Sequence, residues 1–129
     1  SSNIGPDYGY AADYIPKGAS CSGSDITIVY LPSLGDVAKW RIMNAFTIFS
    51  DRGCGVLFRG YDAGGSPNYT LVLLHLAYTG SSSCSGYSGE RDPGAAIGRL
   101  LSPGPVGWGA HVHIELKDGS TMVKPEVVF

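Results

Sequence analysis

Turn-forming residues interrupt this chain so often that they leave room only for short secondary-structure elements. Glycine supplies 19 of its 129 residues and proline 8. Between the turns, the runs 25–31, 55–61, 68–78 and 110–119 are rich in β-branched and aromatic residues, which predicts strands. The loop DAGGSP, with its Gly-Gly pair and proline, indicates a hairpin between the second and third runs. We therefore expect a mainly β fold, built as an antiparallel β-sheet domain.

The segment 32–53 departs from this pattern. Five of its apolar residues roughly follow helical spacing: Val37, Trp40, Met43, Ala45 and Phe46. Ser33 or Asp36 is available as an N-cap, and Gly53 follows the expected end. The segment therefore predicts a short helix inserted into the β domain, although Thr47-Ile48-Phe49 fits a strand equally well.

The length and the charge of the chain limit the domain organisation and the classes of binding partner that we expect. The segment 1–20 combines glycine, proline and tyrosine without a sustained period, so we expect an irregular N-terminal arm followed by one β domain over 21–129. The formal net charge is −2, with no run of Lys or Arg, which disfavours nucleic acid and anionic membranes as partners. No apolar stretch approaches the ~20 residues that cross a bilayer.

The cysteines and the composition favour an extracellular protein. Only 16% of residues are charged, and the chain opens at Ser1 without an initiator Met or apolar leader, as expected of a processed, secreted protein. Cys21, Cys54 and Cys84 make an odd count, which indicates one disulfide and a third thiol with another role.

Two pairings of these cysteines remain open. Cys54 precedes one strand of the predicted hairpin and Cys84 follows its partner, so antiparallel pairing would bring them together and leave Cys21 as a metal ligand. A Cys21–Cys84 bond would instead join two loops. The sequence favours the first pairing only slightly.

The motif His111-Val112-His113 is the strongest chemical signal in the chain. Residues two apart on a strand project to the same face, so both imidazoles converge on one site. Imidazole pairs of this kind suit zinc. Two histidines on a half-exposed strand would give the same pattern without any site, so the motif needs support from elsewhere.

That support comes from three residues earlier in the chain. His75 lies within an otherwise apolar strand, where a histidine is usually a hydrogen-bonded core residue. Asp25 stands where a loop enters a strand, a position that also suits a simple turn residue. Cys21 lies four residues earlier and also has the simpler interpretation of half a disulfide.

Taken in order, these segments resemble the lysostaphin-type zinc endopeptidases. The matching pieces are Cys21-Ser22-Gly23-Ser24-Asp25, Leu73-Leu74-His75-Leu76, Gly94-Ala95-Ala96-Ile97-Gly98 and Gly109-Ala110-His111-Val112-His113-Ile114-Glu115. The tail 124–129 also looks like the family's closing proline and apolar residues. The resemblance covers about residues 21–129, and its specificity lies in the shared order and spacing.

The resemblance implies a role for each matching residue. Asp25 and His113 would be zinc ligands, with Cys21 at the position of the family's first histidine ligand. His75 and His111 would flank the metal-bound water, one as general base and the other at the oxyanion. Glu115 shares the face of the two strand histidines and is expected to be a supporting or structural carboxylate.

The cysteine is the main departure from the family. A thiolate is a good zinc ligand, but it donates more charge than imidazole and makes the metal a poorer Lewis acid. If Cys21 were oxidised, two ligands would hold zinc badly and the site would fail.

Two functions follow. The first is a zinc endopeptidase acting on bacterial cell-wall peptide cross-bridges. The second is a non-catalytic glycan- or cell-wall-binding protein, lectin-like, on the same scaffold, favoured by the cysteine and by the weakly charged, aromatic-rich composition. Trp108 and Tyr10 are candidates for a binding groove in either case, although packing is the better explanation for any single one of these aromatic residues.

Overall fold

The computed structural model describes residues 11–14, 28–48, 52–81, 83–101, 112–119 and 121–123, and for 11–14, 112 and 121–123 it describes the backbone alone. Within these ranges all regular structure is β. The strands are β1 (Ala11–Tyr14), β2 (Ile28–Tyr30), β3 (Lys39–Thr47), β4 (Cys54–Tyr61), β5 (Pro67–Leu76), β6 (Glu90–Arg91), β7 (Ala96–Arg99), β8 (Val112–Asp118) and β9 (Thr121–Val123). No helix capable of spanning a membrane occurs in this part of the chain.

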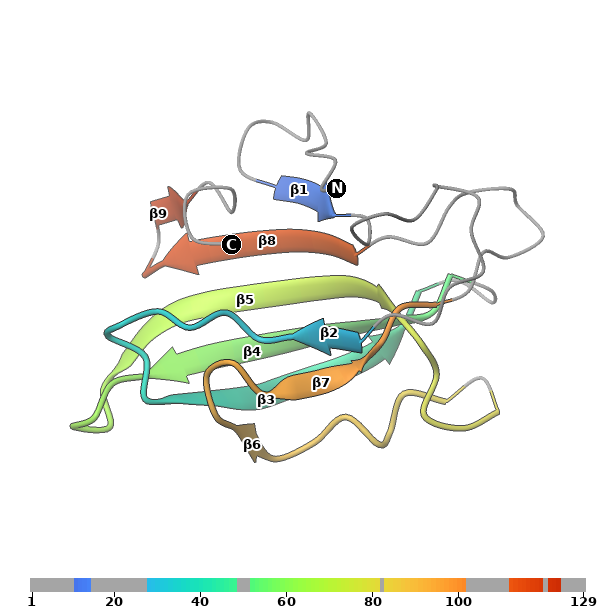
Figure 1. Ribbon diagram of the computed structural model, residues 1–129, viewed down its shortest axis with the longest axis horizontal. Helices are drawn as coiled ribbons and strands as arrows, with labels where there is room; N and C mark the ends of the chain where they lie inside the picture. The colour runs from blue at the N-terminus through green and yellow to red at the C-terminus, as the bar shows by residue number, and fades with distance from the viewer. Residues whose placement is uncertain are drawn as a thin grey trace.

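The strands form two antiparallel sheets (Figure 1). The larger is seven-stranded, in the order β1-β8-β5-β4-β3-β6, with β9 also paired to β8. β1 pairs with 112–115 of β8 and β9 with 116–118, so the two share one edge of that strand. The smaller sheet is the pair β2–β7, which lies across the middle strands β3 to β5. The prediction of a mainly β, antiparallel fold is confirmed.

The core fills the space between the two sheets. From the large sheet it takes side chains with no more than 3% of their surface exposed: Trp40, Val56, Phe58, Leu71, Leu73, Leu76, Ile114 and Leu116. From the other side it takes Val29, Leu31, Ile97 and Leu100. The Trp40 indole N–H is satisfied in this core because it donates to the Pro32 carbonyl at 3.1 Å. One face of the large sheet is therefore the core face, and we call the other its outer face.

The helix predicted within 32–53 is not found, because Lys39–Thr47 form β3. A register shift between Ile42 and Asn44 explains the error. The bulge adds one residue to the strand, so the positions that pack toward the core are Trp40, Ile42 and Ala45. Intervals of two and then three residues imitate helical periodicity in the sequence.

The first 20 residues contain one regular element in the described structure. Ala11–Tyr14, in the segment that the sequence predicted to be an irregular arm, form β1 and pair with β8 in the register Ala11↔Glu115 to Tyr14↔Val112. Asp13 thereby stands opposite His113.

Candidate functional site

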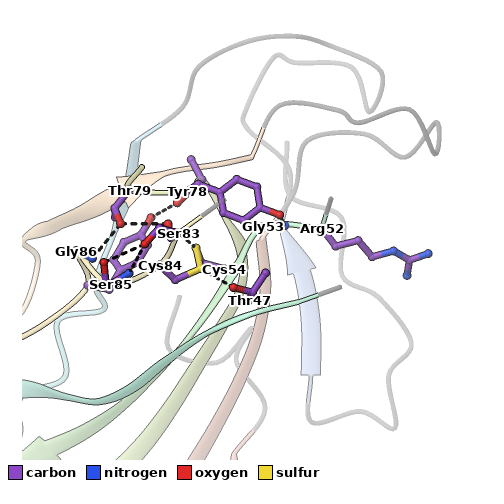
Figure 2. Close-up of a disulfide and its surroundings, with 12 residues drawn as sticks. Thr47, Arg52, Gly53, Cys54, Tyr78, Thr79, Ser83, Cys84, Ser85 and Gly86 are labelled. Atoms are coloured by element: carbon purple, nitrogen blue, oxygen red, sulfur yellow. Dashed lines mark hydrogen bonds between the residues drawn. A yellow bond between two sulfur atoms is a disulfide. The ribbon is translucent and has the colours of Figure 1, made fainter. Parts of the chain in front are cut away.

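A disulfide joins the start of β4 to the loop after β5 (Figure 2). Cys54 and Cys84 are bonded at 2.01 Å, with 5.7 Å between their Cα atoms, and both are buried. This confirms the favoured cysteine pairing. Because the chain has three cysteines, Cys21 has no cysteine left in the chain with which to pair.

His75 lies in a bulge near the end of β5. The register with β4 runs from Val56↔Leu73 to Cys54↔Leu76, so Leu74 and His75 together stand opposite Gly55. Leu73 and Leu76 are both fully buried in the core, three residues apart, and the two residues between them are half-buried. The bulge therefore takes His75 out of the core, where the apolar run would otherwise place it.

The backbone at His75 is strained. Its φ is 70°, the only positive φ of a non-glycine residue in the described ranges. Left-handed backbone costs an L-residue energy, and at His75 it accompanies the extra residue of the bulge. Strained positions of this kind are concentrated at functional sites, which makes His75 a candidate site residue.

Hydrogen bonds hold His75 at two points. Its ring Nδ1 lies 2.9 Å from the Arg52 carbonyl oxygen, and its own carbonyl accepts from the Leu101 N–H at 3.0 Å. A carbonyl only accepts, so Nδ1 carries the proton and donates to it. In a neutral ring this tautomer has its basic nitrogen at Nε2, as a general base or metal ligand requires.

His113 lies on the adjacent strand, β8, and is held by a carboxylate. Ile114 and Leu116 point into the core, so His113 and Glu115 lie on the outer face. His113 Nε2 and Glu115 Oε2 are 3.2 Å apart, with 16% and 41% of the two side chains exposed. With Nε2 donating to the carboxylate, Nδ1 carries the lone pair. A ligating histidine is commonly oriented by this kind of second contact.

The sheet register brings the two histidines close. Leu74 is paired with His113, so His75 follows the residue directly opposite His113 on the neighbouring strand. The backbone positions of the two histidines are therefore neighbours at the β5–β8 junction, with His113 on the outer face and His75 in the bulge.

The remaining predicted site residues lie outside the described ranges. They are Cys21, Asp25, His111, Trp108 and Tyr10. Among the residues that are described, no three His, Cys, Asp or Glu side chains cluster as a metal site would require. Of the three predicted zinc ligands the structure describes His113, and of the two predicted catalytic histidines it describes His75.

Sequence reasoning missed two contributors to this region. The Arg52 carbonyl, which holds the His75 ring, is a backbone group and carries no residue-type signal. Phe46 lies over Gly55 beside Leu74, since a Cβ on Gly55 would sit 2.4 Å from the Phe46 ring and 2.9 Å from Leu74. The signal for that contact was a glycine inside a strand, which often marks close approach of another group.

A second feature lies further along the outer face, at the β3–β4 end. It is a groove of about 580 Å³, whose lining includes Lys39, Arg41, Tyr61, Asp62 and Glu90. The Arg41 guanidinium stacks 4.7 Å from the centre of the Tyr61 ring, and its Nε and Nη2 donate to Glu90 Oε2 at 3.1 and 3.0 Å. These contacts raise the pKa of Arg41, chiefly through the hydrogen bond to Glu90. We call this feature the Arg41–Tyr61 groove.

Comparisons of the chain with protein-family models, with curated protein sequences and with solved structures find no significant match.

Proposed function

We propose that this chain is a secreted, zinc-dependent endopeptidase of the lysostaphin-type kind, acting on peptide cross-bridges of the bacterial cell wall. The observation that supports it best is the neighbouring position of His75 and His113 on the adjacent strands β5 and β8, each with one ring nitrogen held by an oxygen. A buried disulfide suits the oxidising compartment that the proposal requires.

The donor chemistry of the described residues fits zinc. His113 presents Nδ1 when Nε2 donates to Glu115, and neutral imidazole is a preferred zinc ligand. In the proposed site Asp25 and Cys21 complete the ligand set, and the Cys54–Cys84 bond supports this because it leaves the Cys21 thiol available as thiolate. Bound zinc would supply Lewis-acid polarisation of the scissile carbonyl and a more acidic water.

His75 acts as the general base in this proposal. Its Nδ1–H donates to the Arg52 carbonyl, which orients the ring, and Nε2 is the nitrogen that we propose takes a proton from the attacking water. An imidazole suits this task because its unperturbed pKa lies near neutrality. His111 is assigned to the oxyanion, and Glu115 keeps the His113 ring oriented.

Metal analysis and hydrolysis of cell-wall substrate together test the proposal. We expect purified protein to contain zinc and to cleave cross-bridge peptides, to lose both properties with a chelator and to regain them with added zinc. His113→Ala should lose zinc, whereas Lys117→Ala, on the same face of β8, should keep it. Protein that neither contains nor takes up zinc, and that hydrolyses nothing after zinc is added, would refute the proposal.

The Arg41–Tyr61 groove supports a second candidate, a glycan-binding protein without catalysis. An aromatic ring flanked by guanidinium, ammonium and carboxylate groups offers an apolar face and polar donors and acceptors for sugar hydroxyls. Binding of cell-wall glycan that survives chelation and His113→Ala, but is abolished by Tyr61→Ala, would favour this function. Glycan binding that disappears with the metal would count against it.

A further inference from the structure

We propose that the Cys54–Cys84 disulfide and the Tyr78 hydroxyl together position His75, by fixing the segment 52–54 that holds its ring. The catalytic meaning of this inference rests on the proposed function, since it concerns the general base of that site. The positioning itself is a property of the fold and is measured separately.

Three consecutive residues of the segment are each attached to a different point, and Figure 2 shows two of these points, Tyr78 beside Gly53 and the bond from Cys54 to Cys84. The Arg52 carbonyl accepts from the His75 ring at 2.9 Å. The Gly53 N–H donates to the Tyr78 hydroxyl at 3.2 Å. Cys54 is bonded to Cys84. The carbonyl that orients the ring is therefore two residues from the disulfide and next to the Tyr78 contact.

The segment also passes close against β5. Gly53 has a φ of +82°, and a Cβ there would lie 2.4 Å from the Leu76 carbonyl oxygen. Its carbonyl accepts from the Ile48 N–H at 2.9 Å, which ties the segment back to the end of β3. Only glycine meets both the space and the backbone angle, so the path of the segment is narrowly defined.

The loop that carries Cys84 is held by hydrogen bonds of its own. Thr79 and Ser83 pair through a backbone hydrogen bond of 2.8 Å, and the Gly86 N–H donates to Thr79 Oγ1 at 2.9 Å. Cys84 therefore sits in a loop with its own internal bonds and is 6% exposed. The disulfide transfers the fixed position of this loop to Cys54 and, through Gly53, to the Arg52 carbonyl.

The consequence is a fixed tautomer at His75. A carbonyl held at hydrogen-bond distance keeps the proton on Nδ1, whereas free histidine prefers the proton on Nε2. Releasing the segment should let His75 return toward that preference, which removes the lone pair from the nitrogen that the proposed reaction uses.

Nitrogen NMR of the histidine rings tests this directly. The ring ¹⁵N signals of the full chain, without added metal, report which nitrogen carries the proton, and His75→Gln identifies the His75 signals. We expect the Nδ1–H tautomer in the native chain, a mixed population in Tyr78→Phe, and a predominantly Nε2–H ring in Cys54→Ala/Cys84→Ala. Tyr69→Phe, at the other end of β5, removes the same chemical group and should leave the His75 signals unchanged.

Retention of the native His75 signals in the folded double-alanine variant would overturn the proposal. If that variant does not fold, Tyr78→Phe decides, and unchanged His75 signals in it would overturn the proposal as well. In active protein the same variants should lose about 10- to 100-fold in kcat/KM, as is typical when a supporting contact to a catalytic or ligating histidine is removed.

The two proposals fail separately. A tautomer that shifts as expected in protein without zinc or hydrolysis would leave the positioning intact and refute the enzyme. Zinc-dependent hydrolysis by a chain whose His75 tautomer is the same in all of these variants would support the enzyme and refute the positioning.

Discussion

At an ordinary strand position, replacement by glycine gives a less stable protein than replacement by alanine. At His75 we expect the opposite, with His75→Gly more stable than His75→Ala. The φ of 70° at His75 places an L-residue in left-handed backbone, which costs about 1–2 kcal/mol. Glycine adopts that backbone without the steric cost but loses about 0.5–1 kcal/mol more in chain entropy on folding than alanine. The difference predicts that His75→Gly is more stable than His75→Ala by about 0.7 kcal/mol.

Both substitutions also remove the ring hydrogen bond to the Arg52 carbonyl, which contributes about 1 kcal/mol. We therefore expect His75→Ala to be destabilised by at least that amount and His75→Gly to lie close to the native chain. Because both lack the imidazole, neither should hydrolyse substrate in the proposed reaction.

Val72, three residues earlier on β5, is the matched control. It is half-buried, pairs with Leu57 and Glu115 in regular register, and has no positive φ. There, Val72→Gly should be less stable than Val72→Ala by about 0.5–1 kcal/mol.

Urea unfolding with the disulfide intact, followed by tryptophan fluorescence, measures all four free energies. Trp40 is fully buried and reports on the core. The same sign of the glycine–alanine difference at both positions would show that His75 carries no backbone strain, and the reasoning for a strained site would fail.

Three further substitutions, at Glu115, Tyr87 and Gly55, each test one contact or one buried group. If the proposed zinc site is correct, Glu115→Ala should weaken zinc binding about 10- to 100-fold in competition titrations, with Lys117→Ala as the unaffected control. Burial raises the pKa of Tyr87, so its neutral form stabilises the fold below the ordinary phenol pKa of about 10, and this stabilisation is lost as pH rises through the folded value. Unfolding free energies of Tyr87→Phe measured across pH 9–11 should therefore fall less steeply with pH than those of the native chain, and an equal slope would contradict this account. Gly55→Ala places a methyl 2.4 Å from an overlying phenyl ring and should cost about 1–3 kcal/mol in urea unfolding. Gly35→Ala, with no atom within 4 Å and no positive φ, should instead stabilise by about 0.4–1 kcal/mol. Equal effects at the two positions would refute the contact.

The sequence predicted the central hairpin and slightly favoured its disulfide, because both depend on local signals. Strands 54–61 and 67–76 flank a Gly/Pro-rich loop, and the two cysteines stand where their antiparallel pairing brings the ends together. Neither inference needed long-range information.

The bulges at Met43 on β3 and at His75 on β5 were not predicted, and for the same physical reason. An extra residue in one strand changes the interval between core positions from two residues to three, and no side chain of β3 or β5 indicates where this happens. On β3 the changed interval imitated a helix. On β5 the run Leu71 to Leu76 is apolar on both faces, so it could not show that His75 leaves the core.

The bulge on β5 also explains why the candidate site and the core constrain each other. Leu73 and Leu76 are both fully buried, so the chain between them must fit two residues where regular pairing provides one. The left-handed backbone at His75 follows from that requirement, and its cost is met by the surrounding core and not by the site. The segment from Arg52 to Cys54 lies directly against this bulge, and the disulfide secures it there. A histidine at this point is therefore oriented by contacts that belong to the fold and that would persist if its chemistry were lost.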